Sequence, residues 1–215
     1  MIAISGLDGA GKSTQIDLIV KKYNTMSVQN LILWCRGGYS PGMKLLKNIL
    51  KVSKQASKEN INRKVSREKS FSNPIVRKTW LGLAILDLIF FYGLYVRIKE
   101  LFGVKIICDR FIYDTLLDFE LNFPQEKVKN WFLWKLLLLI AVTPVKHFVI
   151  TIPVKESLYR SILKKEPFPD SKEVLESRLN KYLKYVSDNE NVIHIDGTAK
   201  IENINFDILK ELELL

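Results

Sequence analysis

The stretch IAISGLDGAGKST, Ile2–Thr14, decides the fold of this chain. It fits the pattern G-x-x-x-x-G-K-[ST] at every defined position, with Gly6, Gly11, Lys12 and Ser13 as the defined residues. A short apolar run precedes the loop and an amphipathic run, TQIDLIVKKY, follows it, which is the strand–loop–helix context of a phosphate-binding loop. The alternative, a glycine turn with a chance lysine, does not account for the strand, the helix and the hydroxyl together.

Each residue type in this P-loop has a physical task. Glycines let successive backbone N–H groups turn inward around phosphates, and the helix that begins near Lys12 adds its N-terminal dipole. Lys12 is expected to reach the β- and γ-phosphates of ATP, and the Ser13 hydroxyl to bind Mg²⁺. The loop residues predicted to bind ATP are Gly6, Leu7, Asp8, Gly9, Ala10, Gly11, Lys12, Ser13 and Thr14.

Short apolar runs alternate with helical patterns along the chain. Runs such as KIIC and FVITI are apolar without interruption, as strands buried on both faces of a sheet should be. The alternation predicts an α/β fold with a five-stranded parallel sheet between two layers of helices. The predicted strands are Ile2–Ser5, Leu31–Trp34, Val104–Cys108, His147–Ile152 and Val192–Ile195. The predicted helices are Lys12–Tyr23, Pro41–Val52, Pro74–Leu101, Gln125–Val142, Lys155–Lys164, Ser171–Ser187 and Ile201–Leu212.

The composition is that of one ordinary globular domain. The 215 residues are 47% hydrophobic, enough for a sizeable core, and we expect a single domain over residues 1–215. Cys35 and Cys108 lie far apart inside apolar runs, which favours two buried thiols over a disulfide or metal site. Because no basic segment precedes the first apolar run, we expect no secretory signal and a cytoplasmic protein.

Two features invite other interpretations. Thr79–Val96 is nearly long enough to span a bilayer, but Asp87 would be costly in lipid, so we expect a buried helix there, and another in Trp131–Val142. The formal net charge is +10, and Lys44–Lys69 holds a net +7 of it. This block overlaps a basic insert, Ser53–Asn73, that we expect to be a mobile solvated loop; attraction to phosphates, nucleic acid or an anionic membrane surface is the alternative.

A second group of polar residues follows a buried strand. Val104–Cys108 ends in Asp109-Arg110-Phe111, and the carboxyl end of such a strand faces the same crevice as the P-loop. Asp109 could hold Mg²⁺ there, and Arg110 could grip the phosphate of an acceptor with two N–H groups. The alternative is an ion pair at the end of a strand.

With these residues in place, most of the chain resembles the thymidylate kinase family of nucleoside monophosphate kinases. The segments similar to that family are the P-loop with Asp8, CRGGYSPG at Cys35–Gly42, DRF at Asp109–Phe111, KKEPFPD at Lys164–Asp170, and Asp196-Gly197-Thr198. The P-loop is highly specific for phosphate binding, whereas the other segments are less specific.

The resemblance implies a sheet order of 2-3-1-4-5 and a role for each matching residue. Lys164–Asp170 would belong to a mobile basic lid, about residues 164–171, whose Lys164 or Lys165 covers the transferring phosphoryl group. Gly197 and Thr198 would pack the adenine. The residues that the resemblance places around the acceptor are Asp8, Arg36, Asp87, Arg110 and Asp114, and those with a catalytic role are Lys12, Asp109, Arg110, Lys164 and Lys165, with Ser13 and Asp109 at the metal.

The departures from the family pattern fall on the acceptor side. Arg36 is followed by two glycines where the family has Glu-Pro, and Asp87 is followed by Leu88 where the family has an arginine that grips the nucleotide phosphate. After DRF the chain continues with Ile112–Thr115 instead of the family's serine and Tyr-Gln pair. ATP as donor is therefore better supported than thymidylate as acceptor.

Three functions remain open from the sequence. The first is a kinase of thymidylate type, the second a kinase of the same fold that acts on a phosphorylated sugar or lipid-linked precursor, and the third a regulatory or nucleic-acid-dependent ATPase. A small-molecule phosphate acceptor is the expected partner, and nucleic acid is not expected. A homodimer through the apolar Pro74–Leu101 segment is left open, as is peripheral contact with a membrane, which we do not predict.

Overall fold

The computed structural model describes residues 1–34, 71–164 and 170–215 and contains the predicted sheet. All of its strand pairs are parallel, and the strand order β2-β3-β1-β4-β5 is the expected 2-3-1-4-5. The strands are β1 (Ile2–Gly6), β2 (Asn30–Trp34), β3 (Lys105–Asp109), β4 (Lys146–Thr151) and β5 (Val192–Asp196). Each observed strand overlaps a predicted one, with ends that differ by at most one residue.

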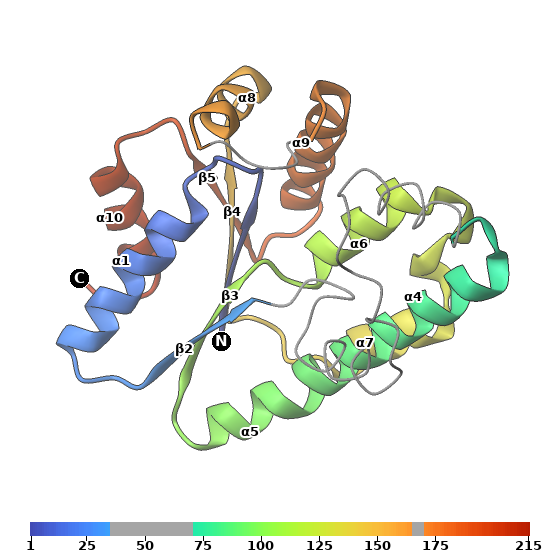
Figure 1. The fold of residues 1–215 in the computed structure, drawn as a ribbon. Helices are drawn as coiled ribbons and strands as arrows, with labels where there is room; N and C mark the ends of the chain where they lie inside the picture. Colours follow the sequence, from blue (N-terminus) through green and yellow to red (C-terminus); the bar gives the residue numbers. More distant parts are fainter. Residues whose placement is uncertain (35–70, 165–169) are drawn as a thin grey trace, which may run out of the picture.

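Helices cover both faces of this sheet (Figure 1). Helices α1 and α10 lie on one face, and α4, α5, α6 and α7 lie on the other. The strand pattern explains why, since successive side chains point to opposite faces: Ala3 packs in the core under α4 and α7, while Ile4 packs in the core that contains α1. The α-helices are α1 (Lys12–Thr25), α4 (Pro74–Leu88), α5 (Val96–Leu101), α6 (Ile112–Asn122), α7 (Phe132–Ile140), α8 (Val154–Leu163), α9 (Lys172–Ser187) and α10 (Ile201–Glu211).

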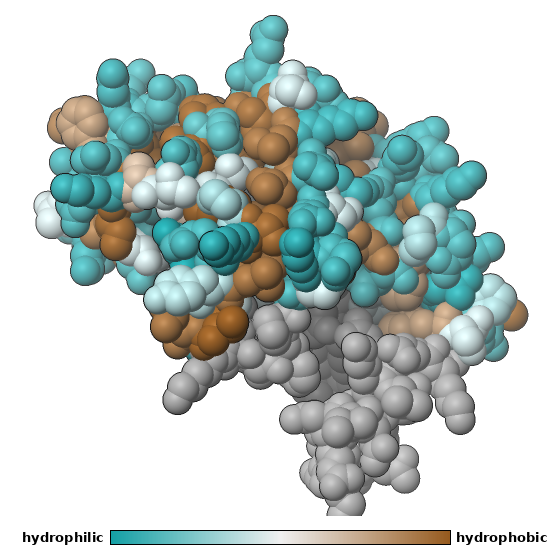
Figure 2. Space-filling view, turned by 90° about the horizontal axis from the view of Figure 1, so that it is seen from above, coloured by the Kyte–Doolittle hydropathy of each residue, from teal (hydrophilic) through white to brown (hydrophobic). Residues whose placement is uncertain are grey.

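The register of the sheet positions the site. Ile4 of β1 pairs with Asp109 of β3, and Gly6 pairs with Ile150 of β4. The carboxyl ends of three neighbouring strands therefore meet where the P-loop leaves β1. Seen from above, this end of the molecule shows hydrophilic side chains on both sides of a hydrophobic band (Figure 2).

The predicted helix Pro74–Leu101 is continuous but not uniform. It consists of α4, a π-helical segment at Ile89–Tyr95, and α5. Asn73 caps its start, because the side-chain oxygen accepts a hydrogen bond from the Ile75 N–H, and Pro74 occupies the first turn. By length and composition this helix could cross a membrane, with 44% of its most apolar window buried. One face of it, including Leu88 with no exposed area, belongs to the core, whereas Leu86, Phe90 and Leu94 are about half exposed, so the expected burial holds for one face only.

Two parts of the helix prediction are wrong. Gln125–Val142 is not one helix: Pro124–Glu126 and Val128–Asn130 are 3-10 turns, and α7 begins only at Phe132. The reason is local, since Lys127 has a φ of 45°, a left-handed conformation that no α-helix accommodates. Helix α6 is absent from the predicted elements, and its first turn is closed by Asp114, whose side chain accepts a hydrogen bond from the Phe111 N–H.

The predicted helix Pro41–Val52 and most of the basic insert lie outside the described residues. Of the insert, Phe71 and Ser72 are helical and Asn73 caps α4.

Candidate active site

The P-loop has the backbone that its glycines predict. Gly6 has a φ of 139°, and a Cβ atom there would lie 2.0 Å from the carbonyl oxygen of Ile150 on β4. Gly11 has a φ of 89° and is the N-cap residue of α1. Both positions therefore exclude other residues, the first mainly by space and the second by conformation. The loop leads directly into the N-terminus of α1, where backbone N–H groups favour an anion.

Lys12 lies folded against the loop that carries it. Its Nζ donates hydrogen bonds to the carbonyl oxygens of Leu7, at 2.7 Å, and Gly6, at 3.1 Å. The Asp8 carboxylate is 3.8 Å from the same nitrogen. Burial lowers the pKa of Lys12 from 10.5 to about 7, and the nearby Arg110 cation lowers it as well, against an opposite effect of Asp8. A phosphate bound here would place negative charge beside the Lys12 amine and would favour its protonated form.

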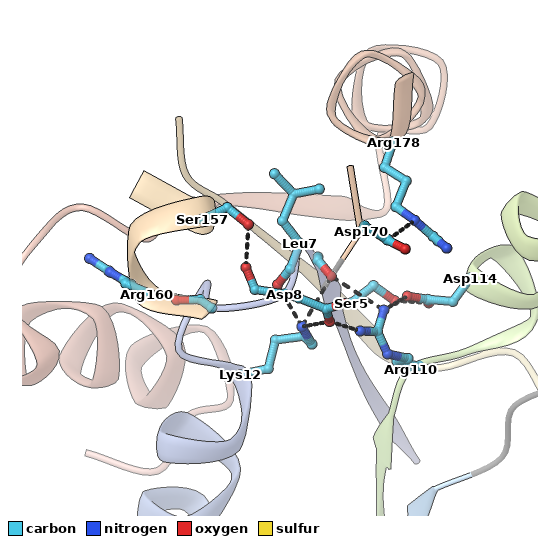
Figure 3. Close-up of polar contacts among 12 residues, drawn as sticks. Ser5, Leu7, Asp8, Lys12, Arg110, Asp114, Ser157, Arg160, Asp170 and Arg178 are labelled. Carbon is cyan, nitrogen blue, oxygen red and sulfur yellow. Dashed lines mark hydrogen bonds and ion pairs between the residues drawn. The ribbon is translucent and has the colours of Figure 1, made fainter. Parts of the chain in front are cut away.

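Arg110 joins the end of β3 to the P-loop. Its backbone N–H donates to the Ile4 carbonyl at 2.9 Å, and its φ is 73°, so the chain turns sharply here. The side chain is 9% exposed and forms ion pairs with Asp8 of the loop and Asp114 of α6 (Figure 3). Burial acts to lower the pKa of Arg110, but the surrounding anionic groups outweigh it and raise that pKa above its ordinary value.

Half of the predicted site residues line a small cavity of about 210 Å³. The lining residues are Asp8, Gly9, Gly11, Lys12, Ser13, Thr14, Trp34, Asp109, Arg110 and Lys164. Residues from the P-loop, the ends of β2 and β3, and the end of α8 thus meet in one place. A larger cavity of about 540 Å³ lies instead at the amino end of β2, between Asn24, Asn30 and Lys99, and none of the predicted site residues lines it.

The candidate metal ligands Ser13 and Asp109 both line the small cavity. Burial raises the pKa of the Asp109 carboxyl, while Lys12 and Arg110 act in the opposite direction. Among the described residues no three His, Cys, Asp or Glu side chains form a cluster that could hold a metal ion. A hydroxyl and a carboxylate nevertheless fit Mg²⁺, which keeps several waters and takes further oxygen ligands from the phosphates.

Helix α8 packs against the P-loop and donates hydrogen bonds to its carbonyls, a contact that the sequence did not reveal. Ser157 donates a hydrogen bond to the Asp8 carbonyl at 2.6 Å. Arg160 donates to the carbonyls of Gly9, at 3.1 Å, and Gly197, at 3.4 Å. The loop after β5 lies directly against the P-loop, since a Cβ on Gly197 would be 3.0 Å from the Ala10 carbonyl.

Gly197 thus lies beside the P-loop, and its packing against the adenine of ATP stays a prediction. Thr198 is exposed, and both its N–H and its hydroxyl donate to the carboxylate of Asp196.

The structure does not place Asp114 where the sequence predicts it. Its side chain is 1% exposed and is absent from the residues that line the cavity. Its two oxygens accept hydrogen bonds from Ser5, Tyr182, Arg110 and the Phe111 N–H. This carboxylate lies beneath the site and supports Arg110, and the geometry gives no direct contact with an acceptor.

Asp87 does not line the small cavity either. It lies half-buried on α4, where burial raises the pKa of its carboxyl from 3.8 to about 6. The following residue, Leu88, is fully buried and belongs to the core. Arg36 and Lys165 lie outside the described residues, so their predicted roles stay predictions.

Comparison with known proteins finds a distant relative of the whole chain. No model of a protein family matches the chain. Among curated proteins, it is similar to the thymidylate kinase of Fervidobacterium nodosum, with 26% identity over 215 residues that cover 97% of this chain and 96% of the relative. The similarity extends over nearly the whole of both chains. The chain is a distant, full-length homologue of a protein named thymidylate kinase.

Proposed function

We propose that this protein is an ATP-dependent nucleoside monophosphate kinase that transfers the γ-phosphoryl group of ATP to thymidylate, giving dTDP and ADP. The observation that carries the proposal is the small cavity, in which the P-loop, Asp109, Arg110 and Lys164 converge. A P-loop alone would equally serve a hydrolase, but an arginine at the end of the adjacent strand provides a grip for a second phosphate. The distant homology to a thymidylate kinase supports the same reaction class.

ATP, the phosphoryl donor, would be bound by the P-loop, which helix α8 supports. Lys12 would turn from the carbonyls of Gly6 and Leu7 toward the β- and γ-phosphates of ATP. Mg²⁺ held by Ser13 and Asp109 would neutralise charge on those phosphates. The covalent work is small, so the residues act by positioning groups and balancing charge.

The acceptor side rests on Arg110 and Asp8. Arg110 would bind the phosphate of the acceptor, and Asp8, in the loop, would face the acceptor. Lys164 lines the same cavity and would cover the transferring phosphoryl group, together with Lys165 of the proposed lid. Arg36 would be a further contact to the acceptor phosphate.

One observation favours a second candidate, a kinase of another small phosphorylated acceptor such as a phosphosugar. Leu88 occupies the position at which the resembling family has its phosphate-gripping arginine, and Leu88 is fully buried. A contact between a phosphate and a charged donor is worth ~1.5–3 kcal/mol, or roughly ten- to a hundredfold in affinity. We therefore expect thymidylate to bind this protein more weakly than it would bind a protein that has the arginine at this position.

A substrate screen tests the proposal. Purified protein with MgATP is offered each nucleoside monophosphate and a panel of phosphosugars, and ADP release and product mass are recorded. The proposal expects a phosphorylated product from thymidylate, absent in Lys12→Ala. A product only from a phosphosugar would favour the second candidate, and ATP hydrolysis with no phosphorylated product would contradict both. A low micromolar Michaelis constant with brisk turnover for thymidylate would contradict the expected weakness.

A further inference from the structure

We infer that Asp114 is a positioning residue for Arg110, held in place by a line of hydrogen bonds from Tyr185 through His147 and Ser5. The functional part of this inference, that Arg110 is thereby aimed at the acceptor phosphate, rests on the function proposed above. The structural part, that Asp114 sets the orientation of the Arg110 side chain, does not.

The carboxylate of Asp114 is surrounded by donors. One oxygen accepts from the Arg110 guanidinium, at 3.3 Å, and from the Tyr182 hydroxyl, at 2.6 Å. The other accepts from the Ser5 hydroxyl and from the Phe111 N–H, at 2.9 Å. Asp114 and Tyr182 are at most 1% exposed, so the carboxylate has no access to bulk water and its direction is set by these four groups.

The direction of the next hydrogen bonds follows from counting protons. Ser5 has one hydroxyl proton and donates it to Asp114, so at its 2.8 Å contact with His147 it must accept from Nε2–H. The other ring nitrogen, Nδ1, then carries no proton and accepts from the Tyr185 hydroxyl at 3.4 Å. Every proton in the line therefore points toward Asp114. His147 is neutral in this arrangement, in agreement with its burial, which lowers its pKa from 6.5 to about 4.

This line connects parts of the fold that are far apart in sequence. Ser5 comes from β1, His147 from β4, and Tyr182 and Tyr185 from α9, and all act on the first turn of α6. Arg110 precedes that turn in a left-handed conformation, with its guanidinium between Asp114 and Asp8. Without the Asp114 carboxylate, the described side-chain contacts of Arg110 would be the Asp8 pair and a 3.4 Å hydrogen bond to the Gly6 carbonyl. The guanidinium would then keep only one of its two carboxylate partners, and we expect its orientation to be less restrained.

Kinetics test the functional part. Asp114→Asn keeps the size of the side chain and removes its charge, and Tyr182→Phe removes one donor to the same oxygen. We expect Asp114→Asn to raise the Michaelis constant of the acceptor roughly tenfold or more while changing that of ATP less than about threefold. In an Arg110→Ala background, the same substitution should have no further effect on the acceptor, because residues that act through one another are not additive. Full additivity, or an equal effect on both substrates, would overturn the positioning role.

A matched control separates positioning from loss of stability. Glu126 is also a buried acid paired with an arginine, Arg77, at 2.6 Å, but it is absent from the small cavity. Glu126→Gln should lower the melting temperature without the acceptor-specific change.

A ligand-free measurement tests the structural part. The ¹⁵N–¹H signal of the Arg110 side chain, assigned by its loss in Arg110→Lys, should show restrained guanidinium rotation in the unmodified protein and faster rotation in Asp114→Asn. An unchanged Arg110 signal in a folded Asp114→Asn protein overturns the inference whatever the activity. A changed signal in a protein that phosphorylates no acceptor upholds the structural part, and the failure then belongs to the proposed function.

Discussion

Arg110 and Asp8 form an ion pair that joins the end of β3 to the P-loop. The pair depends on the parallel register, in which Ile4 lies beside Asp109 and the two chain segments leave the sheet at the same level. Lys12 approaches the same carboxylate to 3.8 Å, so the Asp8 carboxylate is shared by two basic side chains. Phosphate groups that enter the cavity would compete with Asp8 for the Lys12 amine and the Arg110 guanidinium. Binding and kinetic measurements on variants of these two residues can therefore detect the competition.

Lys12→Ala should abolish phosphoryl transfer while the protein stays folded. Within the described residues the Lys12 amine contacts the carbonyls of Gly6 and Leu7 and the carboxylate of Asp8, whereas in catalysis it would stabilise negative charge on the transferring phosphoryl group. Loss of one such donor lowers turnover on the order of 10²–10³-fold. Steady-state kinetics with Lys21→Ala, an exposed lysine on the same helix, supply the control. Near-normal turnover of Lys12→Ala at saturating ATP would refute the P-loop assignment.

ATP binding should take up a proton at alkaline pH. Free Lys12, with a pKa of about 7, is largely neutral at pH 8.5, whereas against a phosphate it should be protonated. Calorimetry at pH 8.5 in buffers of different ionisation enthalpy should therefore give an uptake of roughly one proton per ATP. Lys12→Met keeps an unbranched apolar stem and removes the titrating amine, so any residual binding should be free of this uptake. Uptake of equal size in that variant would assign the proton elsewhere.

Arg110→Ala and Arg160→Ala should affect different substrates, the acceptor in the first variant and ATP in the second. Arg110 lines the cavity beside the proposed acceptor, and its loss should raise the Michaelis constant of the acceptor about ten- to a hundredfold. Arg160 binds the Gly9 and Gly197 carbonyls on the donor side, so its loss should weaken ATP more than the acceptor. Initial-rate kinetics varied in both substrates distinguish them. If both variants changed the two Michaelis constants in the same way, the two arginines would not act on separate substrates.

The protein should lose stability as the pH falls from about 6.5 toward 4, in part because of His147. Its folded-state pKa, about 4, is below the ordinary value of 6.5, so the unfolded chain binds the proton more readily in this range. The stability present above pH 6.5 is therefore lost on acidification, by roughly 2 kcal/mol between pH 7.5 and 5 from this group. Urea unfolding at both pH values measures it. His147→Gln can still donate to Ser5 but does not titrate, and its loss should be smaller by that amount; equal losses would exclude His147 as the cause.

Leu88→Arg should unfold the protein instead of restoring an acceptor contact. Leu88 has no exposed area, and an uncompensated buried charge costs about 3–5 kcal/mol. Leu86→Arg is the matched control on the same helix, since Leu86 is 47% exposed and should tolerate the change within about 0.5 kcal/mol. Thermal unfolding of both variants decides the matter. A stable Leu88→Arg protein with tighter thymidylate binding would show that the core can open to let this position face the acceptor.

Contiguous patterns in the sequence were enough to predict the sheet and most of the residues that line the small cavity. The P-loop with its glycines, the apolar strands and the Asp109-Arg110 pair at a strand end each occupy neighbouring residues, and local geometry follows from such runs. The strand order came from the resemblance to a family, and the observed order agrees with it.

The surroundings of Arg110 depend on contacts that no contiguous pattern contains. Asp114 is 109 residues from Ser5, and Ser5 is 142 residues from His147, yet all three meet beneath the P-loop. Whether Asp114 faces a ligand or the interior is decided by which donors the packing of α6 against β1 and α9 brings to it. The same holds for Leu88, which the packing of α4 turns into the core. Short-range patterns indicate where a strand ends, but the direction of a side chain at that end depends on distant partners that only folding brings within hydrogen-bonding distance.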